Sequence, residues 1–147
     1  MTIPPFEPSG NLPPGIHMAS WDEIVGRYGA TPQRLQLLQG LKLALDDLKA
    51  ADCRTVYIDG SFVTETAVPG DFDACWEMSG VDVAKLNPVL LTFDSGRATQ
   101  KARNAGELFP AEYQAEPQGT RFIDFFQRDK NTGSPKGIIQ VDMKGLP

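Results

Sequence analysis

The clearest pattern of apolar positions along the chain lies between Thr31 and Cys53. Leucines recur there at steps of three and four residues, at Leu35, Leu37, Leu38, Leu41, Leu45 and Leu48. This spacing predicts a long helix with one broad buried face. Thr31 can cap the helix, and Pro32 suits its first position, where no backbone N–H is needed. A shorter helix is predicted after Ser20, an N-cap residue followed by acids and closed by glycine.

Three other stretches have the pattern of strands. Residues 54–59 (RTVYID) are rich in β-branched and aromatic side chains and end at Gly60, and residues 72–77 follow after a loop. Residues 137–143 (GIIQVDM) predict a third strand, with Asp142 near its end. Between the second and third strands, we expect a polar helix followed by an irregular loop over residues 97–113, and an apolar helical face around Phe122 that packs in the core.

The order of these elements is helix, strand, loop, strand, helices, strand, which predicts an α/β (α+β) fold with a small mixed sheet covered by helices on one face. Residues 1–15 hold five prolines and two glycines, so they are expected to form an extended arm before a single domain over residues 16–147. The arm can lie on the surface of this domain or on a partner protein, and the sequence leaves both alternatives open.

Composition narrows the class of protein. A chain of 147 residues fits one domain, and 41% hydrophobic with 22% charged residues is typical of a folded soluble protein. Without a long apolar stretch or a leader-like N-terminus, we expect a cytoplasmic location and no membrane partner. Two distant cysteines and one histidine indicate neither a zinc site nor a disulfide framework. A net charge of −5 disfavours a broad basic face for nucleic acid, although a local basic site remains compatible with it.

Asp71 and Asp73 raise the question of chemistry. Side chains two residues apart in a strand project from the same face, so the two carboxylates point together and repel each other. A divalent cation between them, Mg²⁺ or Mn²⁺, removes this repulsion and prefers oxygen ligands. An aspartate at the start of a strand is often only part of a turn. The neighbouring motif favours the metal-binding interpretation.

That motif is Gly60-Ser61, which comes at the end of the first predicted strand and is separated from Asp71 by nine residues. A residue without a Cβ lets the backbone approach a triphosphate closely, and Ser61 can donate its hydroxyl and its N–H to phosphate oxygens. A phosphate-binding turn beside a metal-binding pair predicts phosphoryl or nucleotidyl transfer, with a nucleoside triphosphate (NTP) as substrate.

The Gly-Ser turn, the spacer and the Asp-x-Asp pair resemble the signature of the nucleotidyltransferase superfamily of the polymerase β type. Residues 37–76 and 122–143 also resemble a group of small bacterial and phage single-domain proteins placed in that superfamily, and the likeness extends over most of the chain from about Thr31 onward. This resemblance implies a minimal nucleotidyltransferase-like fold. It further implies a magnesium-dependent transfer of a nucleoside monophosphate from an NTP to a hydroxyl on a protein, an RNA or a small molecule.

In that superfamily a third carboxylate on a later strand completes the metal site and acts on the attacking hydroxyl, and the resemblance assigns this role to Asp142, with Glu77 as second choice. A basic residue often lies near the triphosphate, and Lys136 is the candidate, ahead of Arg54 and Lys144. The expected site then has Asp71, Asp73 and Asp142 as catalytic and metal-binding residues, and Gly60, Ser61 and Lys136 as nucleotide-binding residues.

At 147 residues, the sequence is expected to lack the second, acceptor-binding domain that larger members of the superfamily carry. Minimal domains of this kind resemble antitoxins that attach nucleotides to a toxin. They also resemble domains that have lost activity and only bind a partner, so a catalytically inactive binding module is the alternative function. In that case the arm is the natural segment to bind the partner protein. A role in nucleic-acid processing is a weaker expectation, because of the net negative charge.

Overall fold

The computed structural model of the chain describes residues 3–92 and 97–147. Its centre is a five-stranded mixed sheet in the order β1-β5-β2-β3-β4. The strands are β1 (Gly15–Ala19), β2 (Val56–Asp59), β3 (Phe72–Trp76), β4 (Gly106–Pro110) and β5 (Gly137–Val141). β1 pairs with β5 and β3 pairs with β4 in parallel, whereas β2 is antiparallel to both of its neighbours. The predicted α+β fold with a small mixed sheet is confirmed.

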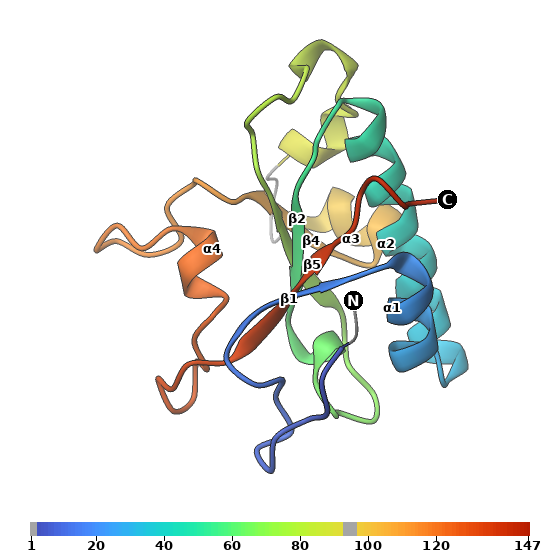
Figure 1. Cartoon of the computed structure of the whole chain (residues 1–147). Helices are drawn as coiled ribbons and strands as arrows, with labels where there is room; N and C mark the ends of the chain where they lie inside the picture. The colour runs from blue at the N-terminus through green and yellow to red at the C-terminus, as the bar shows by residue number, and fades with distance from the viewer. Residues whose placement is uncertain (1–2, 93–96) are drawn as a thin grey trace.

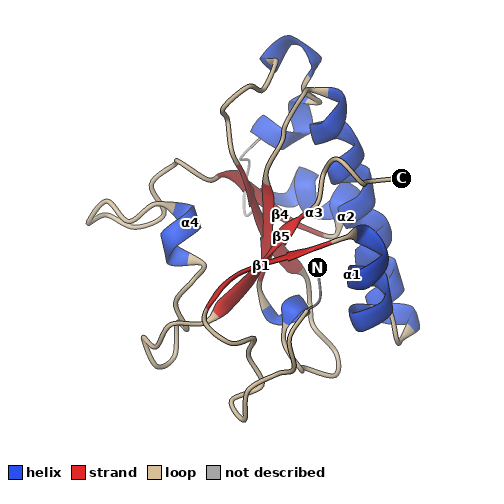
Figure 2. Cartoon of the chain, viewed as in Figure 1, coloured by secondary structure: helices blue, strands red, loops and turns tan. Residues whose placement is uncertain are grey.

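Helices cover one face of this sheet. α1 (Trp21–Tyr28), α2 (Pro32–Ala50) and α3 (Ala98–Asn104) lie on that face, and the short α4 (Phe122–Phe125) lies on the other (Figures 1 and 2). Three 3₁₀ helices are η1 (Ser61–Val63), η2 (Val83–Lys85) and η3 (Pro88–Leu91). As predicted, Ser20 and Thr31 cap α1 and α2, each accepting a hydrogen bond from the backbone N–H three residues on. Within the described ranges, no helix has the length and apolar character needed to cross a membrane.

The alternation of side chains along the strands sorts the apolar residues into two clusters. Val56 and Ile58 of β2 face α1 and α2 and belong to the main core, whereas Tyr57 packs on the α4 face. That second, smaller cluster consists of Tyr57, Cys75, Phe109, Ala111, Phe126 and Ile138. By the same alternation, Asp59, Asp73 and Glu107 project from the α4 face. The acidic residues therefore lie opposite the helical layer.

The buried face of α2 differs from the prediction at one position. Leu35 is 44% exposed, whereas the other five leucines of the pattern are buried. In the first turn of α2 the buried position belongs to Arg34, which is 6% exposed. Arg34 can lie there because its guanidinium donates hydrogen bonds to backbone carbonyls of the loop after β2.

Two strands were not predicted. β1 follows the proline-rich arm, and β4 occupies part of the segment that was expected to be an irregular loop. Both strands have only five residues and form the two edges of the sheet. Glycine or proline at their ends resembles loop composition, and such residues are tolerated at sheet edges. Pairing with β5 and β3 therefore decides the conformation of these segments.

The arm packs on its own domain rather than standing free. Ile3 and Leu12 belong to the main core and are 4% and 1% exposed. Arg27 of α1 donates hydrogen bonds to the carbonyls of Ile3 and Pro4, at 2.7 and 3.0 Å. Figure 1 shows the arm crossing the end of the sheet at which β5 begins. Of the two alternatives left open by the sequence, the structure shows the first.

Candidate metal and nucleotide site

Three carboxylates meet at one end of the sheet. Asp73 of β3 lies opposite Glu107 of the neighbouring β4, and Asp71 precedes β3 by one residue. One oxygen of each of Asp71, Asp73 and Glu107 lies within 4.8 Å of the others. Three carboxylate oxygens gathered in this way are the ligand type that Mg²⁺ and Mn²⁺ prefer. The residues present therefore fit a divalent cation.

The electrostatics of this cluster are unfavourable without a cation. Burial raises the pKa of Asp73 to about 7, and the charges of Asp71, Asp59 and Glu107 add to the effect. Burial and the charge of Glu107 also raise the pKa of Asp71. Like charges held close together favour protonation of one of them, whereas a bound cation favours the ionised forms. The cluster is thus better matched to a metal ion than to water alone.

α3 positions the third carboxylate. Gln100 of this helix is fully buried, and its side chain accepts a hydrogen bond from the Leu108 N–H at 2.8 Å and donates one to the Val89 carbonyl at 3.2 Å. The amide therefore fixes the backbone of β4 beside Glu107. Lys101, one residue further along α3, places its Nζ 3.0 Å from the Glu107 carboxylate and offsets part of its charge.

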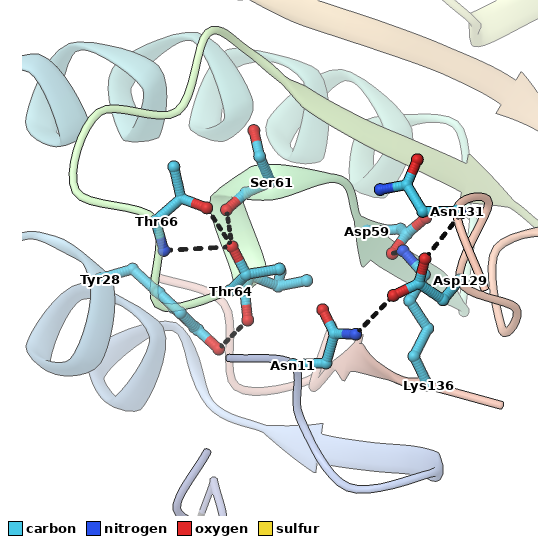
Figure 3. A network of polar contacts seen from close by, with 10 residues as sticks. Asn11, Tyr28, Asp59, Ser61, Thr64, Thr66, Asp129, Asn131 and Lys136 are labelled. Carbon is cyan, nitrogen blue, oxygen red and sulfur yellow. Dashed lines mark hydrogen bonds and ion pairs between the residues drawn. The ribbon is translucent and has the colours of Figure 1, made fainter. Parts of the chain in front are cut away.

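A fourth carboxylate near the cluster belongs to Asp59, the last residue of β2. It lies directly opposite Asp73 in the antiparallel β2–β3 pair. Its Oδ1 is 2.7 Å from Nζ of Lys136, and the two side chains are 6% and 15% exposed. Burial raises the pKa of Asp59, and the ammonium of Lys136 opposes that shift. Figure 3 shows Lys136 extending from the start of β5 toward Asp59.

The Gly60-Ser61 turn packs directly against the metal-binding pair. Gly60 has a φ of +90°, a conformation that L side chains rarely adopt. A Cβ at this position would lie 3.1 Å from the Asp73 backbone nitrogen and 3.2 Å from its Oδ2. Ser61 begins η1 and is exposed. The turn thus places the exposed Ser61 directly after a glycine whose backbone packs against Asp73.

The loop that follows the turn is held in place from two helices. Arg34 of α2 donates to the carbonyls of Phe62 and Thr66 at 2.8 and 2.5 Å. The hydroxyl of Tyr28 in α1 donates to the Val63 carbonyl at 2.9 Å. Within the loop, Thr64 bonds both Ser61 and Thr66 (Figure 3). These bonds fix the backbone around Ser61, as a preformed binding turn requires.

These elements surround a cleft of about 880 Å³, a size within the usual range for small-molecule sites. One part of its lining consists of Gly60, Ser61, Asp71 and Asp73. Another part comes from the segment before β5 and carries the cations Arg128, Lys130 and Lys136. Asp129 shapes that segment, because its carboxylate accepts hydrogen bonds from the Asn131 N–H and from the Asn11 side chain of the arm, at 2.8 and 3.0 Å (Figure 3).

The structure brings five of the six predicted site residues to this cleft, and Asp142 is the exception. β5 is antiparallel to β2 with Gln140 opposite Tyr57, so Asp142 lies at the opposite end of the sheet from Asp59. Its Oδ1 is 3.4 Å from the Gly145 N–H. The expectation that Asp142 completes the metal site is therefore corrected, and Glu107 occupies that position.

The secondary candidates also lie away from the cleft. Glu77 follows β3 at the far end, where it accepts a hydrogen bond from the Tyr57 hydroxyl at 2.7 Å. Arg54 precedes β2 at that same end, and Lys144 lies two residues beyond Asp142. Sequence reasoning missed Glu107 and Asp59. The alternation of Glu107, Leu108 and Phe109 between a glycine and a proline was a signal for a short strand.

Comparisons with known proteins place the chain at the level of a family. No curated protein and no solved structure matches it. A family model, described as a family of unknown function (DUF6932), matches residues 4–142, which include the arm from residue 4 onward, the whole sheet and every residue of the cleft discussed above. The chain therefore belongs to the DUF6932 family.

Proposed function

We propose that the chain is a magnesium-dependent nucleotidyltransferase, which moves a nucleoside monophosphate from an NTP to a hydroxyl acceptor. One observation carries the proposal. Three carboxylates from β3, β4 and the loop before β3 converge within 4.8 Å, and two of them, Asp71 and Asp73, line the same cleft as the glycine-serine turn. The position of the turn and of the pair on two adjacent antiparallel strands agrees with the resemblance to the nucleotidyltransferase superfamily.

Asp71, Asp73 and Glu107 would hold Mg²⁺ or Mn²⁺ in this site. When bound, the metal supplies positive charge that offsets the triphosphate and the leaving pyrophosphate. Ser61 and the backbone of Gly60 would bind phosphate oxygens beside the metal, since the Gly60 backbone packs closely against Asp73. Lys136 contributes a positive charge, and the ion pair with Asp59 fixes the position of its ammonium group.

The transfer forms one bond and breaks one. The oxygen of the acceptor hydroxyl attacks the α-phosphorus, and the new O–P bond replaces the bond to the oxygen that bridges the α- and β-phosphorus atoms. Pyrophosphate leaves with that electron pair. The hydroxyl proton passes to Glu107, which takes the role that the resemblance assigned to Asp142, and then to water. Positioning and neutralisation of charge account for most of the rate enhancement in such reactions.

The test is transfer of a labelled nucleoside monophosphate in the presence of Mg²⁺. Asp73→Asn is expected to lower the rate by about 100-fold or more, as removal of a key electrostatic group does in enzymes. Asp46→Asn is the matched control, because this exposed aspartate pairs with Lys42 on α2, outside the cleft. Equal transfer by Asp73→Asn and the wild type would rule out the mechanism.

The alternative of an inactive module that binds a partner protein through the arm has less support. Residues of the arm that could contact a partner already contact this chain. Ile3 and Leu12 lie in the core, and Asn11 donates a hydrogen bond to Asp129. Conversely, the acidic cluster raises the pKa of Asp73 and lowers stability at neutral pH, a cost that a purely structural domain has no need to keep.

A further inference from the structure

The distribution of unpaired cations distinguishes one surface of this chain. Nine of the fourteen lysines and arginines bond carboxylates or backbone carbonyls. The other five, Arg54, Arg121, Arg128, Lys130 and Lys144, form no ion pair or side-chain hydrogen bond with the described residues. Three of these five, Arg121, Arg128 and Lys130, belong to the single segment 119–136, which contains α4 and continues along the cleft.

This segment lines two adjoining hollows. Arg128 and Gly133 belong both to the cleft and to a second, more open groove of about 610 Å³. The second groove is lined further by Thr120, Arg121 and Gln127, with Asp124 as its only carboxylate. The second groove, lined by two guanidinium groups, therefore continues from the cleft. The segment around α4 that lines it lies on the opposite side of the sheet from α1 and α2 (Figure 1).

One aromatic ring lines the cleft near the segment that carries these arginines. Phe125 lines the cleft and is only half-buried, and its ring centroid is 6.2 Å from that of the buried Phe126. Guanidinium groups bind phosphate oxygens in a bidentate manner and also stack on flat rings. Cations along a groove together with an accessible aromatic ring are typical of proteins that bind single-stranded nucleic acid.

We propose that the acceptor of the transfer is the terminal hydroxyl of a short single-stranded nucleic acid. This inference rests on the proposed function. The terminal nucleotide enters the cleft beside Phe125, and the phosphates that precede it bind Arg128 and then Arg121. The terminal hydroxyl oxygen forms the new bond to the α-phosphorus, pyrophosphate leaves with the electron pair of the broken P–O bond, and the strand grows by one nucleotide. Because the net charge is −5, the chain favours a short strand that contacts these few cations over a long duplex, which needs a broad basic surface.

Binding is tested without catalysis by the fluorescence anisotropy of a labelled single-stranded 8-mer, in RNA and DNA arms, at several salt concentrations. The Arg121→Glu/Arg128→Glu double variant is expected to bind at least about tenfold more weakly and to reduce the salt slope by about two, one for each lost phosphate contact. The control is Arg54→Glu/Lys144→Glu, which makes the same change of charge at the two unpaired cations outside both hollows. It is expected to bind within twofold of the wild type.

Folding is not at issue, because Arg121 and Arg128 are exposed and lack side-chain partners among the described residues. Equal weakening by the two double variants would overturn the proposal, as would an acidic peptide that displaces the 8-mer at equal concentration. Extension of the strand on addition of NTP and Mg²⁺ is a separate measurement. Arginine-dependent binding without extension would support the nucleic-acid site and count against the proposed reaction. Transfer of nucleotide to other acceptors without binding of the 8-mer would support the reaction and overturn the nucleic-acid site.

Discussion

Both ends of the sheet carry acidic side chains, but the side chains at the two ends differ in their hydrogen-bond partners. At the far end, Glu77 accepts a hydrogen bond from Tyr57, and Glu112 accepts from the Met78 N–H. At the cleft end, Asp71 and Asp73 accept no hydrogen bond within the described residues, and their pKa values are raised by burial and by neighbouring carboxylates. An acid that bonds a donor of its own chain is satisfied, whereas the cleft end carries negative charge that still needs a counterion.

The largest expected effect contrasts Glu107 with Asp142, the two candidates for the third carboxylate. Glu107→Gln is expected to lower nucleotide transfer by about 10²- to 10³-fold, because it removes a charge from the cluster. Asp142→Asn, at the other end of the sheet, is expected to leave the rate within twofold. Rates of labelled transfer at saturating Mg²⁺ measure both. The reverse result would return the third role to Asp142.

The next effect concerns the buried pair of Lys136 and Asp59. Lys136→Met leaves the Asp59 carboxylate without its cation beside Asp73, and the free energy of unfolding is expected to fall by about 2–3 kcal/mol. Adding Asp59→Asn to this variant should restore most of the loss, since the uncompensated charge is then gone. Urea unfolding gives both values.

Lys42→Met is the control for this pair, because Lys42 pairs with the half-exposed Asp46 on the surface of α2. The change in its free energy of unfolding is expected to stay below about 0.5 kcal/mol, apart from the lost contact with the chain end. Similar losses for the two lysine variants would mean that burial at the cleft does not strengthen the pair.

A smaller effect is expected from Asp73→Asn on the stability of the metal-free protein. The folded protein holds the Asp73 proton up to its raised pKa of about 7, whereas the unfolded chain releases it near a pKa of 3.8. The folded state therefore binds more protons in this window, and the free energy of unfolding falls as the pH rises from 4 to 7.

Asp73→Asn should remove this dependence and stabilise the metal-free protein by about 1–2 kcal/mol at pH 8, after allowance for solvent screening. Thermal unfolding across this pH range measures the difference. Mg²⁺ should stabilise the wild type at pH 8 and have little effect on the variant. The same pH dependence of stability in the wild type and the variant would show that the charge of Asp73 does not destabilise the metal-free protein.

The smallest effect is expected at Gly60. Gly60→Ala places a Cβ against Asp73 at a positive φ and should lower the free energy of unfolding by about 1 kcal/mol. Gly26→Ala is the matched control, because Gly26 lies inside α1 with no neighbour within 4 Å of the added Cβ. It should stabilise the protein by about 0.5–1 kcal/mol. Chemical denaturation distinguishes the two signs, and stabilisation by Gly60→Ala would contradict the close contact.

Local spacing allowed the prediction of α1, α2, β2 and β3, and of the part of the site from Gly60 to Asp73. Alternation within one strand already places Asp71 and Asp73 on the same face, and no tertiary information is needed for this. Glu107 reaches the cluster only because β4 pairs with β3 in parallel after a long crossover. Which strand becomes the neighbour of β3 is decided by packing, which a reading of single segments does not contain.

Lys136 and Asp142 illustrate the same limit within one strand. They flank β5, Gly137–Val141, whose five residues span about 17 Å at the usual rise per residue. Only one of the two can therefore lie at the cleft, although both were expected there. The antiparallel pairing of β5 with β2 brings Lys136 to Asp59 and carries Asp142 to the other end. The direction of a strand is a property of the sheet rather than of its own sequence.

The way in which the arm is tied down affects any attempt to shorten this protein. A proline-rich start looks dispensable and invites removal before expression. Yet Leu12 accepts a hydrogen bond from the Gly137 N–H and fills the core, and Asn11 holds the Asp129 turn that carries Lys130 and Lys136. A trimmed version that begins at Gly15 would expose apolar surface and release one wall of the cleft. Loss of ligand binding in such a version would then report a loosened wall, not a binding role of the arm itself.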